Sequence, residues 1–248
     1  MKTLLKNSYV YKIRNLFGIK PSLFNIDNSK LNSSISDGFF WRTDNGYKTL
    51  FRFMDLTNFF YEKKSLLEFV FFDNNNQLIK TFLKEVNLNN EFYIDSELLN
   101  NEGYGVFYVF HKSKDKINSC IRQSCYTGYS LNNNIPSFVH GNTPTTLKDI
   151  NPENKKIIYG LGGKHLFAKK IYKVQNYINA QNSEILILNP CDGSLKIEVN
   201  NKNFFLDEGC SKLINLNKCK TIEIKSKCYL LRPIIFDYYD GYIDVYHG

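Results

Sequence analysis

The last twenty residues of the chain, 229-YLLRPIIFDYYDGYIDVYHG-248, repeat the pattern of an earlier segment, 122-RQSCYTGYSLNNNIPSFVHG-141. In both segments an arginine precedes a strand, a polar turn follows, and a returning strand ends on His-Gly. In the later segment Asp240-Gly241 is a strong hairpin signal, because a type I′ turn needs positive φ at both central positions. A repeat at this spacing predicts a domain that is built twice.

Short strands separated by Asn, Asp and Gly turns continue through most of the chain. Residues 103–110, GYGVFYVF, have the clearest strand character, and residues 73–76, DNNN, predict a turn because Asp and Asn tolerate left-handed backbone. Such a pattern favours antiparallel sheets over a parallel α/β sheet. We therefore predict an all-β chain made of two related antiparallel β-sandwich domains.

The chain length of 248 residues accommodates two domains of about 100–120 residues. At the N-terminus, Leu5, Tyr9, Ile13 and Leu16 lie at helical spacing while lysines lie elsewhere, which predicts a basic amphipathic helix over residues 2–17. Prolines and glycines between 141 and 165 are typical of a connection between domains. The predicted division is a basic helix with a linker (1–36), a first sandwich (37–142), a linker (143–166) and a second sandwich (167–248).

The net charge of +8 and the sequence pI near 9.0 are typical of proteins that bind a nucleic acid or an anionic surface. The lysines are scattered among asparagines, with no basic run of five or more, so nucleic-acid binding is not favoured. The helix over 2–17 leaves two interpretations open. It rests on an anionic membrane surface, or it packs on the body of the protein or across a dimer interface.

The six cysteines form no CxxC pair, and no histidine lies at zinc-finger spacing from them. No signal peptide is evident, and no apolar run approaches the roughly eighteen residues that a membrane span needs. These features predict a cytoplasmic protein with reduced thiols. We expect no metal and no cofactor.

The order of elements resembles the β-sandwich family of sensory rhodopsin transducers. The resemblance is carried by a strand that ends in an Asn-containing turn, Ile187-Leu188-Asn189-Pro190, followed by paired strands and a late strand across the sheet. It covers residues 183–236 and, more loosely, 48–130, and it rests on layout rather than on a diagnostic motif. It implies a multimeric binding or adaptor module and not an enzyme.

The repeated Arg/His ends contain the candidate site residues. An arginine and a histidine on neighbouring strands would suit an anionic ligand, because arginine supplies a planar fork of donors and histidine donates or titrates. Nearby tyrosines would add aromatic faces and hydroxyls that suit sugar rings. In the structural alternative each arginine pairs with an internal carboxylate, such as Asp237 or Asp244, and each histidine caps a strand. The predicted ligand-binding residues are Arg122, His140, Arg232, His247, Tyr126 and Tyr242.

Other groups of residues give weaker evidence for a functional site. Asp237, Asp240 and Asp244 are separated by the Asp240-Gly241 turn and do not predict a calcium site. The glycine-rich stretch 160–165 lacks the spacing of a phosphate-binding loop, and the sequence contains no motif of a nucleophilic hydrolase. The favoured function is a non-catalytic binding or scaffold protein for a saccharide or another polar, anionic ligand, assembled as a homo-oligomer. Two alternatives remain: an enzyme that acts on a sugar or sugar nucleotide with His140 or His247 as general base, and a peripheral membrane or nucleic-acid binder that uses the N-terminal helix.

Overall fold

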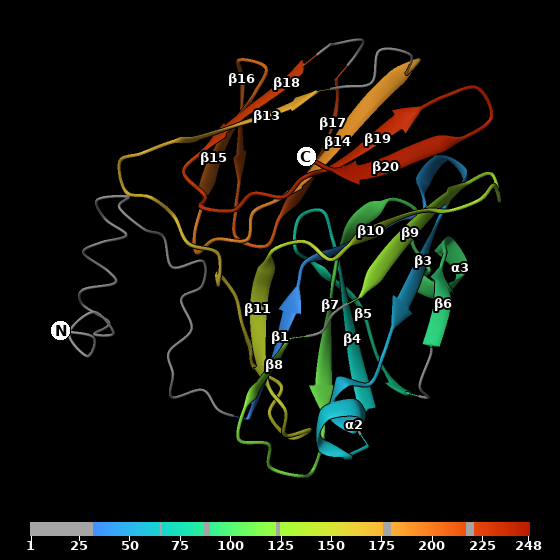
Figure 1. Cartoon of the computed structure of the whole chain (residues 1–248), viewed down its shortest axis with the longest axis vertical. Helices are drawn as coiled ribbons and strands as arrows, with labels where there is room; N and C mark the ends of the chain where they lie inside the picture. The colour runs from blue at the N-terminus through green and yellow to red at the C-terminus, as the bar shows by residue number, and fades with distance from the viewer. Residues whose placement is uncertain (1–31, 65, 87–89, 123–124, 176–179, 217–220) are drawn as a thin grey trace.

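The structure is a computed structural model, and it describes residues 32–64, 66–86, 90–122, 125–175, 180–216 and 221–248 (Figure 1). The predicted N-terminal helix, residues 2–17, lies outside the described residues. With 57% strand and 6% helix, the protein is nearly all-β. The described strands form five sheets of four strands each, in which β1–β8 is the only parallel pair.

The N-terminal part of the chain forms three of these sheets, which we name after a central strand. Their strand orders are β12-β11-β1-β8 (the β1 sheet), β2-β7-β4-β5 (the β7 sheet) and β10-β9-β3-β6 (the β9 sheet). The strands are β1 (Ser33–Asp37), β2 (Phe39–Arg42), β3 (Tyr47–Phe53), β4 (Leu66–Asp73), β5 (Leu78–Glu85), β6 (Asn90–Ile94), β7 (Tyr104–Lys112), β8 (Cys120–Arg122), β9 (Tyr126–Leu131), β10 (Ser137–His140), β11 (Pro144–Asp149) and β12 (Ile157–Ile158).

The C-terminal part forms the other two sheets. Their strand orders are β17-β14-β19-β20 (the β14 sheet) and β13-β18-β15-β16 (the β18 sheet). In Figure 1 they lie above the three sheets of the N-terminal part. The strands are β13 (Lys170–Gln175), β14 (Asn182–Leu188), β15 (Leu195–Val199), β16 (Lys202–Leu206), β17 (Ser211–Asn215), β18 (Thr221–Ser226), β19 (Ile234–Tyr238) and β20 (Ile243–His247).

The described helices are short and occur in connections. They are η2 (Asp44–Gly46), α2 (Leu56–Tyr61) and α3 (Ser96–Leu99). The carboxylates of Asp55 and Asp95 cap the N-termini of α2 and α3 by accepting from the amides of Asn58 and Leu98. No helix among the described residues is long and apolar enough to cross a bilayer.

Alternation of apolar and polar residues places one side of most strands in a core. The β14 and β18 sheets enclose a cluster that contains Ile185, Ile197 and Ile224. The β7 and β9 sheets enclose an aromatic cluster that includes Phe51 and Phe107, whose ring centroids lie 4.9 Å apart. A third cluster takes residues from both parts of the chain, so the two parts share a core.

The predicted fold of two tandem β-sandwiches is wrong. The structure instead contains five small sheets of four strands, the organisation of a five-bladed β-propeller. The resemblance to the sensory rhodopsin transducers fails with it. In the N-terminal part the sheets draw on strands that are far apart in the sequence, and this long-range pairing leaves no local signal.

The β1 sheet shows this most clearly, because it uses the segments that were predicted as linkers. Most of β1 falls at the end of the segment 1–36, which was predicted as a basic helix with a linker. This strand pairs antiparallel with β11 and parallel with β8. The strand β11 lies within predicted linker 143–166, and β12 extends it. Ser34 and Ser36 tie β1 to the β7 sheet, since their hydroxyls accept from the amides of His111 and Val109 at 3.0 and 2.8 Å.

A buried guanidinium group joins the two parts. Arg42, at the end of β2, is 1% exposed. It donates through Nε to Asp44 Oδ1 at 2.8 Å and through Nη1 to Glu184 Oε2 at 2.6 Å, and Glu184 lies on β14. Its guanidinium carbon lies 3.9 Å from the centroid of the Tyr47 ring. The Tyr47 hydroxyl donates to that of Tyr238 at 2.8 Å, which in turn donates to Glu184.

This network predicts a large loss of stability for Arg42→Met. The methionine keeps the apolar stem but leaves Asp44 and Glu184 without their cation, and breaking a buried pair in this way costs about 3–5 kcal/mol of unfolding free energy. Urea denaturation measures this loss. Arg52→Met is the matched control: Arg52 pairs with Glu91 at 2.7 Å, but both side chains are more than half exposed, so its loss stays below about 1 kcal/mol. Equal losses in the two variants would contradict the assignment.

Candidate functional site

A buried carboxylate lies where the N-terminal and C-terminal parts meet. Asp37 ends β1 at a register shift after Ser36, and it is 4% exposed. Arg122, Gly141, Arg232 and His247 surround or adjoin it, and we call these five residues the Asp37 junction. They come from β1, β8, the loops before β11 and β19, and β20.

Arg122 and Asp37 form a two-pronged ion pair. The Arg122 Nε and Nη2 atoms donate to the two Asp37 carboxylate oxygens, each at 2.8 Å. This hydrogen bonding raises the pKa of Arg122. Burial nevertheless keeps the pKa of Asp37 above its usual value, although Arg122 and then Arg232 oppose the shift. The Arg122 side chain is still 47% exposed, so the guanidinium can also be reached from solvent.

Arg232 adds a second cation with weak internal bonding. Its Nη1 donates to the Gly141 carbonyl at a long 3.4 Å. Burial lowers its pKa, which the charge of Asp37 opposes and that of Arg122 reinforces. Among the described residues, Asp37 is the only acid that acts on Arg122 and Arg232, so this part of the junction carries one net positive charge.

Neighbouring atoms lie so close to the Gly141 backbone that only glycine fits at this position. A Cβ atom there would lie 2.5 Å from the Phe39 ring and 2.9 Å from Asp37 Oδ2. Any side chain there would therefore force the Phe39 ring or the Asp37 carboxylate to shift.

His247 closes the junction from β20. Its Nε2 lies 3.0 Å from the carbonyl oxygen of His140, so Nε2 carries the proton and donates. Burial, and then the charge of Arg232, lowers the pKa of His247 to about 4. The ring is therefore neutral at neutral pH.

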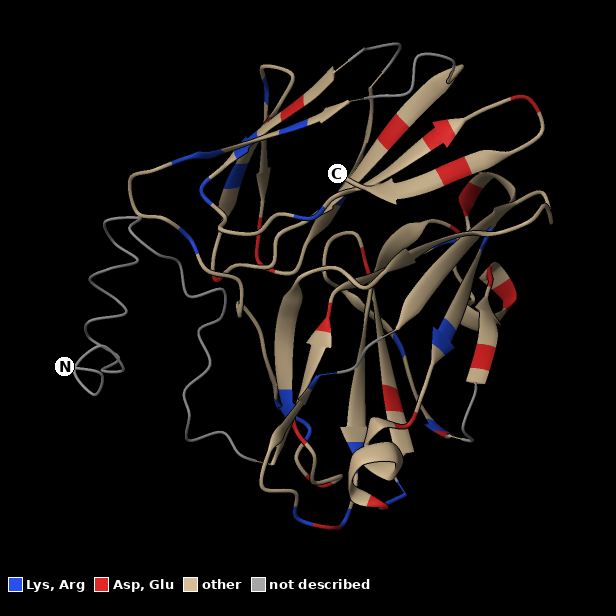
Figure 2. Ribbon diagram, viewed as in Figure 1, with Lys and Arg blue, Asp and Glu red and all other residues tan. Residues whose placement is uncertain are grey.

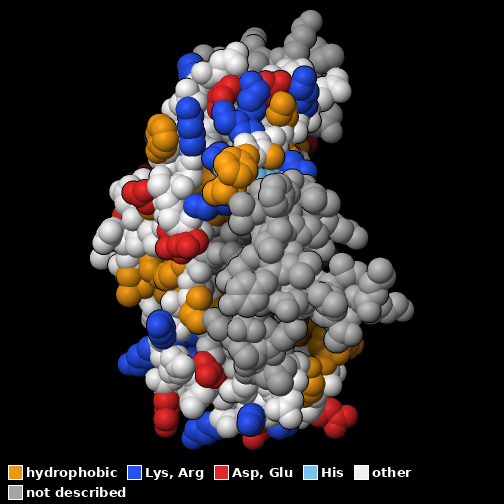
Figure 3. Space-filling model, turned by 90° about the vertical axis from the view of Figure 1, so that its left-hand side faces the viewer, with side chains coloured by type: hydrophobic (Ala, Val, Ile, Leu, Met, Phe, Trp, Pro, Cys, Tyr) orange, Lys and Arg blue, Asp and Glu red, His pale blue; other side chains and the backbone are white. Residues whose placement is uncertain are grey.

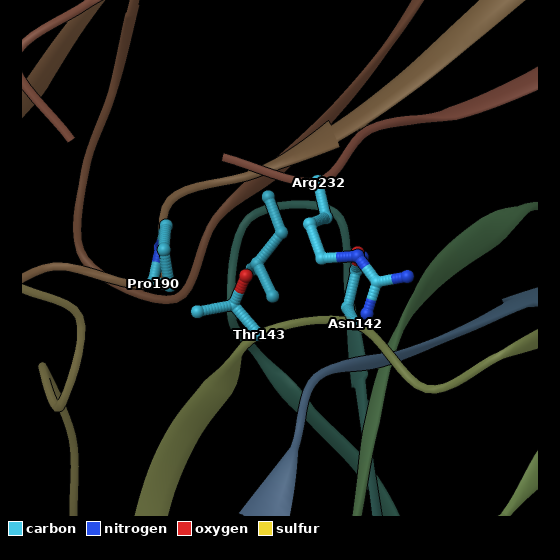
Figure 4. A pocket seen from close by; sticks show the side chains of 5 residues that line it. Asn142, Thr143, Pro190 and Arg232 are labelled. Atoms are coloured by element: carbon cyan, nitrogen blue, oxygen red, sulfur yellow. The ribbon is translucent and has the colours of Figure 1, made fainter. Parts of the chain in front are cut away.

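A small hollow opens beside Arg232 (Figure 4). It is lined by Asn142, Thr143, Leu188, Pro190 and Arg232, and its roughly 160 Å³ of empty space includes open solvent. Asn142 is 3% exposed, and its Oδ1 has no hydrogen-bond partner in the described part of the chain. The Thr143 hydroxyl is committed, since it donates to the Leu230 carbonyl at 3.0 Å. The hollow therefore combines a donor-rich cation with a buried acceptor that no described residue satisfies.

Most of the residues that the sequence singled out meet here, but in an unexpected arrangement. Arg122 lies on β8, in a different sheet from His140 on β10, so these two do not form the expected cross-strand pair. The two His-Gly ends meet each other instead, through His247 and the His140 carbonyl. Tyr126 stacks on the exposed His140 ring, with centroids 4.4 Å apart.

Tyr242 lies elsewhere. It is at the tip of the β19–β20 hairpin, stacked on Tyr239 with ring centroids 4.8 Å apart, whereas His247 pairs with Ile234 at the other end of that hairpin. Arg122 does pair with an internal carboxylate, as the structural alternative expected, but the acid is Asp37 and not Asp237 or Asp244. Asp237 instead accepts from the hydroxyls of Ser183 and Tyr246.

Sequence reasoning missed Asp37 and Asn142. Asp37 lies 85 residues before Arg122, and nothing in the Ser36-Asp37-Gly38 stretch marks it as more than a turn. Asn142 follows the His-Gly end directly, so only its position beside that end could have drawn attention to it. In the regions that the structure describes, no group of three or more His, Cys, Asp or Glu side chains could hold a metal ion.

Comparison with known proteins adds no relative: no family model and no curated protein sequence matches this chain. The function of this protein is therefore inferred from the chemistry of the site itself.

The lowered pKa of His247 predicts a pH dependence. In the unfolded chain its pKa is near 6.5 and in the folded protein about 4, so between these values the unfolded state binds more protons. The His247 contribution to stability is thus fully present above pH 6.5 and is lost as the pH falls toward 4. We expect the free energy of unfolding to fall less steeply over this window in His247→Gln than in the original protein. Parallel pH profiles of the two proteins would contradict the burial of a neutral ring.

Proposed function

We propose that this protein is a non-catalytic binding protein for a small anionic ligand, with acidic sugars as the first class to consider. The single observation that carries the proposal is the hollow beside Arg232, which is lined by a guanidinium with one long internal hydrogen bond and by Asn142, whose buried Oδ1 has no partner among the described residues. The uncompensated charge of the Asp37 junction favours an anion. The buried amide oxygen favours a ligand that also donates, as a sugar hydroxyl does.

The size of the hollow limits the ligand. The enclosed part of the hollow holds about one water molecule, because most of its 160 Å³ is open to solvent. It therefore suits the charged end group of a ligand whose remainder lies on the surface. A carboxylate would accept from Arg232, and a neighbouring hydroxyl would donate to Asn142 once a shift of that side chain exposes its buried Oδ1.

Binding fits the lining groups better than catalysis does. The hollow presents a guanidinium, an amide and a hydroxyl that already donates to a backbone carbonyl. His247, one of the two general bases named in the enzyme alternative, has a low pKa, and its Nε2 is held by the His140 carbonyl, while His140 itself is exposed and is not a lining residue of the hollow. A base with the low pKa of His247 is a weak proton acceptor at neutral pH. The homo-oligomer and the cytoplasmic location expected from the sequence are part of this proposal.

Calorimetry and thermal shift with glucuronate and glucose test the proposal. A ligand at one hundred times its Kd stabilises a protein by about 2.7 kcal/mol. We expect glucuronate to raise the melting temperature and glucose to have a much smaller effect. Arg232→Gln should remove the response because the ligand loses its cation.

The matched control is Lys63→Gln, which removes one positive charge from the exposed pair with Asp115 and alters no residue of the hollow or of the Asp37 junction, so it should keep the response. An undiminished glucuronate response in Arg232→Gln would overturn the proposed site. No response of the original protein to any uronate or sugar phosphate would overturn the proposed ligand class.

A further inference from the structure

The outer face of the β18 sheet presents apolar side chains to solvent. Tyr172 and Val174 of β13 turn inward to the core, so Ile171, on the alternate side of the strand, points outward together with its cross-strand neighbour Lys225. On the opposite edge of the sheet, Phe205 of β16 pairs with Lys196 of β15, and Phe205 is 71% exposed. Single exposed apolar residues are normal on a protein surface, but several that gather on one face mark an interaction site.

The upper part of Figure 3 shows blue Lys and Arg side chains among separate orange ones, with red carboxylates between them. Lys227 follows β18 and donates through Nζ to the Leu166 carbonyl at 2.7 Å, which places the loop before β13 next to this face. Phe167 in that loop is 74% exposed. We call the following set the lysine–apolar face: Leu166, Phe167, Lys169, Ile171, Lys196, Phe205 and Lys227.

The charge of this face is not neutralised by its neighbours. The acids of the same sheet, Glu198 and Glu223, already pair with Lys225 at 2.9 and 2.8 Å, and Lys173 lies 3.4 Å from Glu223. The three lysines of the lysine–apolar face form no ion pair with any carboxylate in the described chain. Figure 2 shows both blue and red segments on the strands of this sheet.

We propose that the lysine–apolar face binds the surface of an anionic lipid bilayer. Apolar side chains that protrude from a basic surface enter the boundary between headgroups and acyl chains, while the lysine ammonium groups remain with the anionic headgroups. This inference does not depend on the proposed function, because the face and the Asp37 junction share no residue.

The mixture of apolar residue types favours a bilayer over a single-stranded nucleic acid. Nucleic acids bind basic surfaces through aromatic rings on which bases stack. Here the two phenylalanines are accompanied by the exposed aliphatic residues Leu166 and Ile171, which offer no stacking surface but insert readily into lipid. Lys196 also lies over the Phe205 ring, 5.8 Å from its centroid, and covers one face of the ring that a base would need.

Sedimentation of the full chain with lipid vesicles tests this proposal. We expect binding to phosphatidylserine-containing vesicles at low salt and little binding to pure phosphatidylcholine vesicles. With about one kcal/mol for each lysine near an anionic surface, Lys196→Gln/Lys227→Gln should weaken binding roughly 10- to 30-fold. Phe167→Ser/Phe205→Ser should weaken it as well, because the inserted rings are lost.

Two double variants elsewhere are matched controls. Lys114→Gln/Lys116→Gln removes the same charge from exposed positions between β7 and β8, and Phe59→Ser/Phe60→Ser removes two rings of α2 that are 61% and 66% exposed. Both controls should bind vesicles like the original protein, and all variants should keep the original melting temperature since the altered side chains are exposed. Unchanged vesicle binding by the two variants of the face would overturn the proposal. Tighter binding to single-stranded oligo(dT) than to the anionic vesicles would overturn it too.

Discussion

A guanidinium group shielded from water is the constraint on which the arrangement of this protein depends. Arg42 cannot be deprotonated, so its charge needs carboxylates and hydrogen-bond acceptors wherever it is buried. Asp44 is local, but Glu184 is 142 residues away, and bringing it within 2.6 Å docks the β14 sheet on the N-terminal part. Burial raises the pKa of Tyr47 to about 12, so its hydroxyl keeps the proton that it donates to Tyr238. The apolar cluster that both parts share packs between them, and the Arg42 network adds directional hydrogen bonds across the same junction of the two parts.

The Asp37 junction exists only because of that docking. Its arginines and histidine come from both parts of the chain, and β10 lies beside β20 where the two His-Gly ends meet (Figure 1). A ligand held by Arg232 and Asn142 would bridge the C-terminal and N-terminal parts. Such a ligand would bind the docked form and not the separated parts, so binding and the stability of the interface would rise together. The lysine–apolar face lies wholly on the β18 sheet and does not share this coupling.

Local sequence patterns predicted local structure well. The two segments with the repeated sequence pattern, 122–141 and 229–248, form the β9–β10 and β19–β20 hairpins. Turn residues also behave as their chemistry requires: Asn76, Asn132 and Asn133 have positive φ, and so does Gly241 in the Asp240-Gly241 turn. The two hairpins also take equivalent places: β9–β10 joins β3 and then β6, and β19–β20 joins β14 and then β17, in two sheets with the same relative order of strands. The β7 and β18 sheets likewise share one strand order, so the pattern of strand pairing repeats along the chain.

The sequence by itself therefore determined the strand-rich character of this protein, its turns, and several of the charged residues that gather at the junction, since these follow from residues close together in the chain. Only the tertiary structure decided that five small sheets form, that β1 pairs with β8 and β11, and that Asp37 is the partner of Arg122. A strand exposes the same hydrogen-bonding groups along both edges, so its residues do not specify which distant strand it will pair with. That choice depends on which apolar faces and buried charges can be satisfied together, and this is a property of the whole fold.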